Sequence, residues 1–180
     1  MDIHPRVGML LSLVLSMLVT MSAHARDTTA LSQRDIDTLR ADIAAMTDAF
    51  ERGDAGLVAE RTHSSLKTMA GGPDAFAAIT RDAIIQLRAA GVSFISQEIG
   101  TPTQVYPAGD EEVCFVPRVS VLEIQARRIK STSYMVAIRP AGGGRWTYLD
   151  GAGLREHPGF LHQLLPDLDR GIKLPPNALE

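Results

Sequence analysis

Gly142-Gly-Gly-Arg-Trp-Thr-Tyr-Leu-Asp-Gly-Ala-Gly153 joins a glycine turn to a short strand, which carries the only tryptophan of the chain. Successive side chains of a strand point to opposite faces of a sheet. Trp146, Tyr148 and Asp150 therefore share one face, and Leu149 lies on the other. The stretch predicts the last strand of a curved antiparallel sheet that is covered by the preceding helices.

Three helices are predicted before the sheet, at residues 32–52, 55–61 and 73–90. Apolar residues of the first recur at three- and four-residue steps, which is typical of an amphipathic helix. Ser32 suits its N-cap, with Asp35 three positions later, and Gly53 suits the position after its last turn. Residues 62–72 are interpreted as a connector.

An antiparallel meander is predicted after Gly91. Its segments are a strand at 92–99, an extended stretch at 101–107, a long strand at 112–125, a turn at 126–130 and a strand at 131–140. Pro117 lacks a backbone N–H and so predicts a bulge or an edge position in the long strand. A helix at 158–165 is expected to follow. Helices followed by such a meander predict an α+β fold, with a single domain at 26–166 and a frayed, proline-rich tail at 167–180.

The long strand is apolar on both of its faces. Val113, Phe115, Val119 and Val121 share one face, whereas Cys114, Val116, Leu122 and Ile124 share the other. A strand of this kind is normally covered on both sides. Helices can cover one face, and a pocket or a second subunit must cover the other. We therefore expect a twofold homodimer that pairs sheet against sheet.

The N-terminus has the features of a secretory signal peptide. An apolar run at residues 7–21 precedes Ala23-His24-Ala25, which matches a small-x-small cleavage site. The run is shorter than the roughly 20 residues that a membrane-spanning helix needs. The sequence therefore predicts a signal peptide at 1–25, a periplasmic or secreted protein, and no membrane anchor after cleavage.

Composition argues against several classes of function. The net charge is −3, and without a basic excess nucleic-acid binding is not expected. Cys114 is the only cysteine, so an intramolecular disulfide is impossible, and its apolar surroundings indicate a buried core residue. The histidines do not have the spacing of metal ligands, and no phosphate-binding or nucleophile motif is present. No metal and no cofactor are expected.

The order of these elements resembles the nuclear transport factor 2-like superfamily, in its SnoaL-like and ketosteroid isomerase-like cone form. The matching features are the long first helix ending at Gly53-Asp54, the short second helix, the Gly71-Gly72-Pro73 start of the third, and the strand at 146–151. The resemblance implies N-terminal helices packed on a curved antiparallel sheet that forms a cone with an internal pocket. The superfamily includes isomerases, dehydratases and binding proteins, so fold alone does not fix function.

In a cone, several side chains of this chain are expected to point inward or to rim the pocket. These candidates are His63, Met69, Tyr106, Arg118, Tyr134, Trp146, Tyr148 and Asp150. They would add a few polar groups to an apolar wall, as in a ligand site. The alternative interpretation is structural, with Trp146 and Tyr148 in the core and Asp150 bonded to turn amides.

The sequence favours a non-enzymatic binding or interaction protein for a small apolar ligand or a protein partner, because it contains no recognisable catalytic set. One alternative is an isomerase or a dehydratase-type lyase that uses an Asp or His base, such as Asp150 beside Tyr134 or Tyr148. Another is an immunity-type inhibitor that docks through the charged residues 127–130 or through the tail.

Overall fold

Helices fill the N-terminal half of the chain, as predicted. The computed structural model describes residues 30–102 and 104–180, so the predicted signal peptide lies outside the described residues. The helices are α1 (Gln33–Arg52), α2 (Ala55–Arg61), α3 (Ser64–Met69) and α4 (Pro73–Ala89). Within these residues, none of the helices has the length and apolarity needed to cross a bilayer.

The ends of α1 and α2 follow the sequence signals. The Ser32 hydroxyl accepts a hydrogen bond from the Asp35 amide, and Gly53 adopts a left-handed conformation at φ 84°. Asp54 then caps α2. Helix α3 was not predicted, because its six residues are too few for an apolar stripe. The residues predicted to be a connector therefore contain a helix.

Six strands form one antiparallel sheet that does not close into a barrel. They are β1 (Val92–Ile99), β2 (Val105–Ala108), β3 (Glu111–Ile124), β4 (Arg127–Pro140), β5 (Thr147–Asp150) and β6 (Ala178–Leu179). The order is β1-β3-β4-β5, while β2 also pairs with β3 and β6 also pairs with β4. The α+β class is confirmed.

Two details of the sheet differ from the prediction. The turn between β3 and β4 occupies only Gln125 and Ala126, both at positive φ, so β4 begins at Arg127 instead of after residue 130. Pro117 marks neither a bulge nor an edge. It lies where β3 changes partner from β1 to β2 and needs no N–H there, while its carbonyl accepts a hydrogen bond from Gly100.

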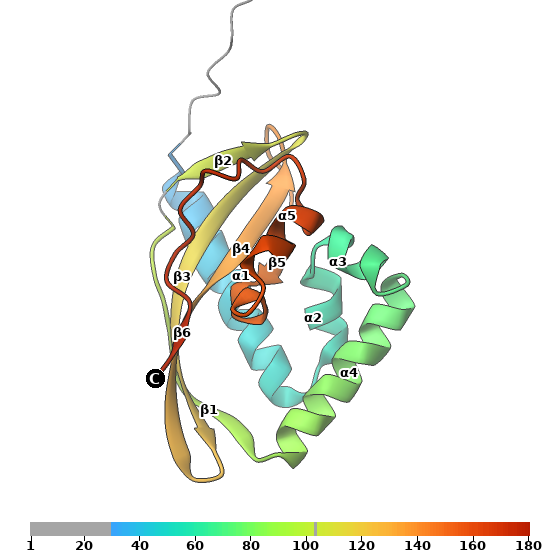
Figure 1. Cartoon of the computed structure of the whole chain (residues 1–180), viewed down its shortest axis with the longest axis vertical. Helices are drawn as coiled ribbons and strands as arrows, with labels where there is room; N and C mark the ends of the chain where they lie inside the picture. Colours follow the sequence, from blue (N-terminus) through green and yellow to red (C-terminus); the bar gives the residue numbers. More distant parts are fainter. Residues whose placement is uncertain (1–29, 103) are drawn as a thin grey trace, which may run out of the picture.

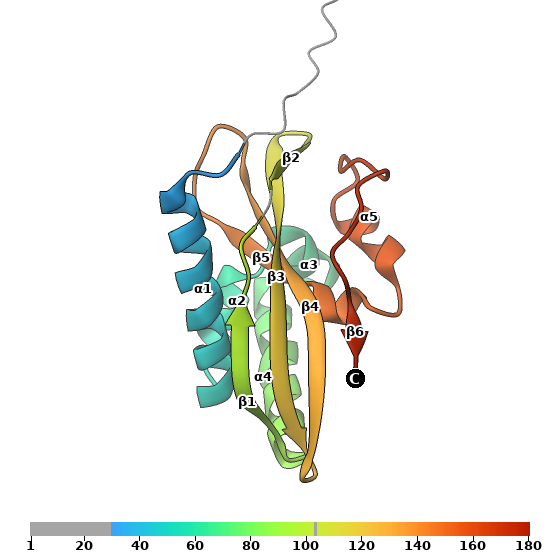
Figure 2. The same cartoon turned by 90° about the vertical axis from the view of Figure 1, so that its left-hand side faces the viewer.

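Both faces of the sheet are covered near β5. Helix α1 packs on one face, where Leu39 and Ile43 join Val116 and Trp146 in one core cluster. The other face is covered by the C-terminal segment, residues 151–174, and Figure 2 shows α1 and this segment on opposite sides of the strands. The segment contains the 3-10 helices η1 (Gly151–Leu154) and η2 (Pro158–Phe160) and the helix α5 (Leu161–Leu164).

The C-terminal segment thus covers Val113 and Phe115, on the face for which the sequence predicts a pocket or a second subunit. The residues predicted to fray are also packed, because Leu168 is 2% exposed and β6 pairs with β4. Part of the argument for a dimer is therefore removed. The homodimer itself stays a prediction, which sedimentation at micromolar concentration tests.

Helix α4 stands apart from the sheet and contacts it only near β1 (Figure 1). Ile84 is its only buried residue, whereas Ile79 and Ile85 are more than half exposed. Glycines with positive φ lie at both ends, Gly72 before the helix and Gly91 after it. The apolar side of α4 is therefore only partly covered by the rest of the described chain.

Candidate functional site

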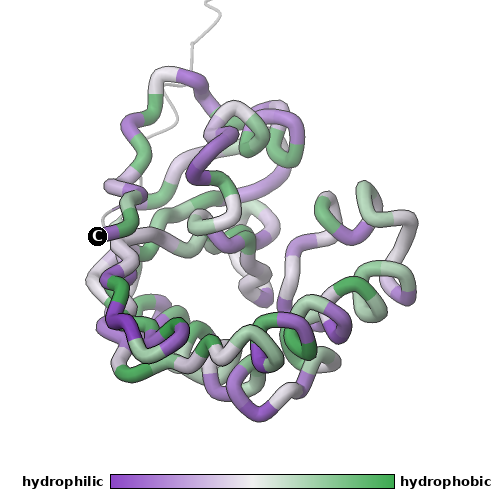
Figure 3. The backbone as a smooth tube through the Cα atoms, turned by 60° about the horizontal axis from the view of Figure 1, so that its bottom comes forward, coloured by the Kyte–Doolittle hydropathy of each residue, from purple (hydrophilic) through white to green (hydrophobic). Residues whose placement is uncertain are grey.

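A cavity of about 340 Å³ lies between the helices and the sheet. Figure 3 shows the backbone coloured by hydropathy, turned so that the bottom of Figure 1 comes forward. The apolar lining of the cavity consists of Ile43, Met46, Phe50, Val58, Leu66, Phe76, Leu87, Phe94, Met135 and Leu149. Its other lining residues are Thr47, Thr62, Arg118, Tyr148 and Asp150. This composition, mostly apolar with few polar groups, is typical of small-molecule sites.

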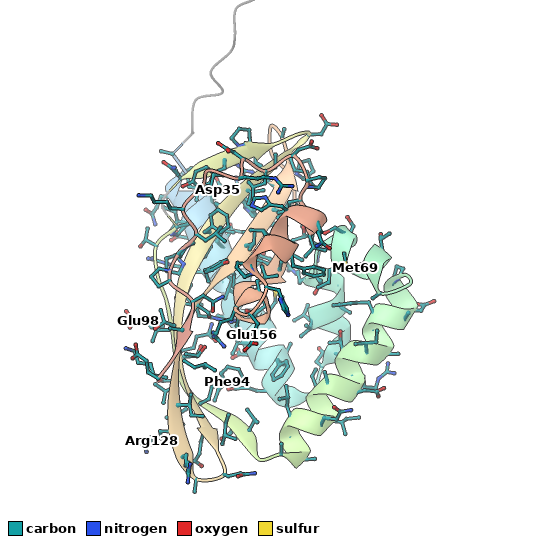
Figure 4. All side chains as sticks on the ribbon, in the orientation of Figure 1. Asp35, Met69, Phe94, Glu98, Arg128 and Glu156 are labelled. Atoms are coloured by element: carbon teal, nitrogen blue, oxygen red, sulfur yellow. The ribbon has the colours of Figure 1, made fainter. Side chains whose placement is uncertain are left out.

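Two phenylalanines form the end of the cavity near β1. The rings of Phe50 on α1 and Phe94 on β1 meet edge to face, with centroids 5.9 Å apart. Figure 4 shows Phe94 between the sheet and the helices. Phe94 also lines two neighbouring hollows of about 330 and 320 Å³, one against α1 and one against α4. Phe94 thus borders all three spaces.

Arg118 and Asp150 form an ion pair at the wall of the cavity. The Arg118 Nη2 donates to Asp150 Oδ1 over 2.8 Å, and the guanidinium side chain is only 11% exposed, against 51% for the carboxylate. Arg118 Nε also donates to the Ser133 hydroxyl. Asp150 accepts a further hydrogen bond from the Ala152 amide, as expected for a residue that bonds turn amides. Both hydrogen bonds are to Oδ1, so this oxygen of the carboxylate is engaged within the fold.

Tyr148 belongs to a second polar group, which includes two residues that the sequence did not suggest. Its hydroxyl donates to Asp42 Oδ2 over 2.8 Å, and Arg61 Nη1 donates to the same oxygen over 2.7 Å. Burial and the adjacent Asp42 carboxylate raise the pKa of Tyr148 far above its usual value. The only feature of the sequence that could have indicated Asp42 is its position three residues after Leu39, on the apolar side of α1.

His63 is buried beside the cavity but does not line it. Its ring nitrogens lie 2.8 Å from Ser65 Oγ and 2.9 Å from Glu111 Oε1, and its backbone amide donates to the Tyr148 carbonyl. Both ring nitrogens are thus engaged within the fold. His63 joins the start of α3 to β3 and β5, and its neighbour Thr62 lines the cavity instead.

The other four candidates lie away from the cavity. Tyr106 and Tyr134 are on the opposite face, where both rings lie 5.7 Å from Phe115. Trp146 is 3% exposed in the core under α1. Met69 is half exposed at the end of α3 (Figure 4). Of the eight candidates, Arg118, Tyr148 and Asp150 therefore line the cavity together.

The described part of the chain contains neither a clustered set of metal ligands nor an exposed thiol. There, no group of three or more His, Cys, Asp and Glu side chains is placed to hold a metal ion. Cys114 is fully buried, and burial raises the pKa of its thiol to about 12. A thiol held protonated in this way is a poor nucleophile.

Comparisons with protein-family models, with curated proteins and with solved structures found no match to this chain.

Proposed function

We propose that the protein binds a small, predominantly apolar molecule in the 340 Å³ cavity and does not transform it. The observation that carries this proposal is that polar groups lining the wall are already paired within the protein. Arg118 is paired with Asp150, and Tyr148 donates to Asp42. The remaining wall is mostly apolar, so burial of an apolar ligand supplies the binding free energy.

The isomerase or lyase alternative has weaker support. It needs a carboxylate or an imidazole that faces the ligand together with a proton donor. Asp150 is held by an ion pair and a backbone amide, and His63 uses both ring nitrogens within the fold. Tyr134 lies on the other face of the sheet. Turnover of an isomerase or dehydratase substrate that disappears in Asp150→Asn would overturn the proposal.

The fold family and the location remain parts of this proposal. Helices preceding an antiparallel sheet, with a cavity between them, are what the resemblance to the nuclear transport factor 2-like cone leads one to expect. The predicted signal peptide supports a periplasmic or secreted ligand-binding protein.

Titration with N-phenylnaphthylamine, an uncharged probe that fluoresces in apolar surroundings, tests the binding function. We expect a saturable signal from the wild-type chain. Val58→Trp fills the cavity and should weaken probe binding about tenfold or more, since it removes the buried contact area of the probe. The control is Ile85→Trp, which adds the same ring at an exposed position of α4 and should bind normally.

Circular dichroism establishes that each variant is folded. If Val58→Trp fails this check, Met46→Trp blocks the same cavity from α1. The proposal is wrong if the wild-type signal does not saturate, or if folded, cavity-filled variants bind the probe as the wild type does.

A further inference from the structure

A row of polar residues, two of them buried, crosses the sheet on the face that bears Arg118. Gln97 of β1 pairs with Ser120 of β3, and Ser120 pairs with Ser131 of β4. Ser120 lies two residues beyond Arg118 on β3, so both side chains point to the same face. Ser120 and Ser131 are 3% and 6% exposed. The polar row, defined as Gln97, Ser120 and Ser131, therefore lies on the same face as Arg118, and Gln97 also lines the hollow of about 330 Å³ beside the cavity.

Two guanidinium groups reach adjacent serines on this face of β4. Arg118 Nε donates to Ser133 Oγ over 3.3 Å, and Arg155 Nη2 donates to Ser131 Oγ over 3.2 Å. Alternate residues of a strand are separated by about 6.6 Å. The two guanidinium groups are therefore both bonded to serines on the same face of β4.

Arg118 and Arg155 differ in their ionic partners. Asp150 neutralises Arg118, but among residues 30–102 and 104–180 no carboxylate oxygen lies within the 4.0 Å ion-pair distance of Arg155. Glu156, the next residue in the chain, is exposed and pairs with neither arginine. Arg155 therefore has no ion-pair partner among the described residues, whereas Asp48 and Glu51 line the hollow that Gln97 also lines. A partly buried cation without a partner is unfavourable, so this arrangement favours the binding of one negative charge.

Unpartnered polar atoms concentrate at the same place. Seven buried side-chain nitrogen and oxygen atoms of the described chain lack a hydrogen-bond partner, and four of them are here. These four are Gln97 Nε2, Gln97 Oε1, Ser120 Oγ and Arg155 Nε. Buried polar atoms are nearly always satisfied in native proteins. Their grouping in one row beside an unbalanced guanidinium is expected where a polar ligand group completes the site.

We propose that the polar row and Arg155 receive the carboxylate of an amphipathic ligand whose apolar chain occupies the cavity. This inference deepens the proposed function and depends on it. A carboxylate supplies the negative charge that Arg155 lacks as a partner, and its two oxygens match the donor fork of a guanidinium. Ser120 Oγ and Gln97 Nε2 supply further donors.

Displacement of N-phenylnaphthylamine by decanoate, decanol and acetate tests the proposal. Decanoate carries both the apolar chain and the carboxylate, decanol carries the apolar chain without the carboxylate, and acetate carries the carboxylate without the apolar chain. We expect decanoate to bind the wild-type chain about tenfold or more tightly than decanol, as for a charge-assisted hydrogen bond, and acetate not to compete. Arg155→Gln should weaken decanoate binding to the level of decanol and leave decanol unchanged. Arg128→Gln, at the exposed tip of the β3–β4 hairpin (Figure 4), is the matched control and should behave as wild type.

Each result decides one part of the inference. Equal binding of decanoate and decanol by the wild-type chain overturns the carboxylate site and leaves the apolar binding function standing, whether or not Arg155→Gln folds. Failure of both decanoate and decanol to displace the bound N-phenylnaphthylamine contradicts the proposed function instead. Calorimetric binding of acetate or inorganic phosphate as tight as that of decanoate would show a site for free anions and overturn the role of the chain.

Discussion

Replacement of Trp146 by alanine should remove a large part of the stability of the protein. The indole is 3% exposed and packs with Leu39, Ile43 and Tyr148 between α1 and the sheet. Truncation of a buried aromatic side chain costs about 3–5 kcal/mol. The Arg139 guanidinium lies 4.4 Å above the ring centroid, and loss of this contact adds about 0.5–1 kcal/mol. We therefore expect the free energy of unfolding to fall by about 4 kcal/mol.

Urea denaturation, monitored by far-ultraviolet circular dichroism, measures this loss. Tryptophan fluorescence cannot be used, because the variant contains no tryptophan. A domain of this size should melt roughly 8–16 °C lower for a change of about 4 kcal/mol. Trp146→Phe keeps an aromatic ring in the cluster and serves as the control, with a smaller loss expected. A variant whose free energy of unfolding stays within about 1 kcal/mol of the wild type would refute the core position of Trp146.

Three further predictions concern the polar and thiol groups. Tyr148→Phe removes the hydrogen bond to Asp42 but keeps the ring, so denaturation should show a loss of about 1–3 kcal/mol, typical of a hydrogen bond to a charged group, with the secondary structure unchanged. The Ser32 hydroxyl and the Arg139 guanidinium lower the pKa of Asp35 below its usual 3.8. The wild type should therefore be more stable than Asp35→Asn at pH values above 3.8, and this difference should disappear as the pH falls through the lowered pKa. Urea denaturation midpoints at several pH values measure the difference. Cys114 should resist a thiol reagent at pH 8 in the folded protein and react once urea unfolds it, because its buried thiol has a pKa of about 12; rapid reaction of the folded protein would contradict its buried position.

The sequence predicted the parts of the fold that depend on local chemistry. The N-cap at Ser32, the end of α1 at Gly53 and the strand at 92–99 follow from caps, glycines and periodicity, and they were confirmed. The hairpin turn was placed wrongly, because Gln125 and Ala126 adopt positive φ without the glycine or asparagine that normally marks such a turn.

The candidate site was predictable only in part, because sequence distance hides contacts between elements. Alternation along the last strand placed Tyr148 and Asp150 on one face, and this face borders the cavity; Arg118 was a candidate as a polar residue in an apolar strand. The same alternation does not say which face is covered by which element. Tyr134 consequently faces the C-terminal segment instead of the cavity. Asp42 and Arg155 act through partners 106 and 24 residues away, and local pattern does not reveal such pairs.

The position of α1 also determines the order in which the chain can fold. The hydrogen bond between Asp42 and Tyr148 spans 106 residues, and the ion pair between Asp35 and Arg139 spans 104. Helix α1 can contact α2 early, through Arg61 and Asp42, but its contacts with β4 and β5 can form only when nearly the whole chain has been synthesised, and closing so long a loop is slow. The β3–β4 hairpin, in contrast, closes through two residues. We infer that folding begins at this hairpin and that α1 is among the last elements to dock on the sheet.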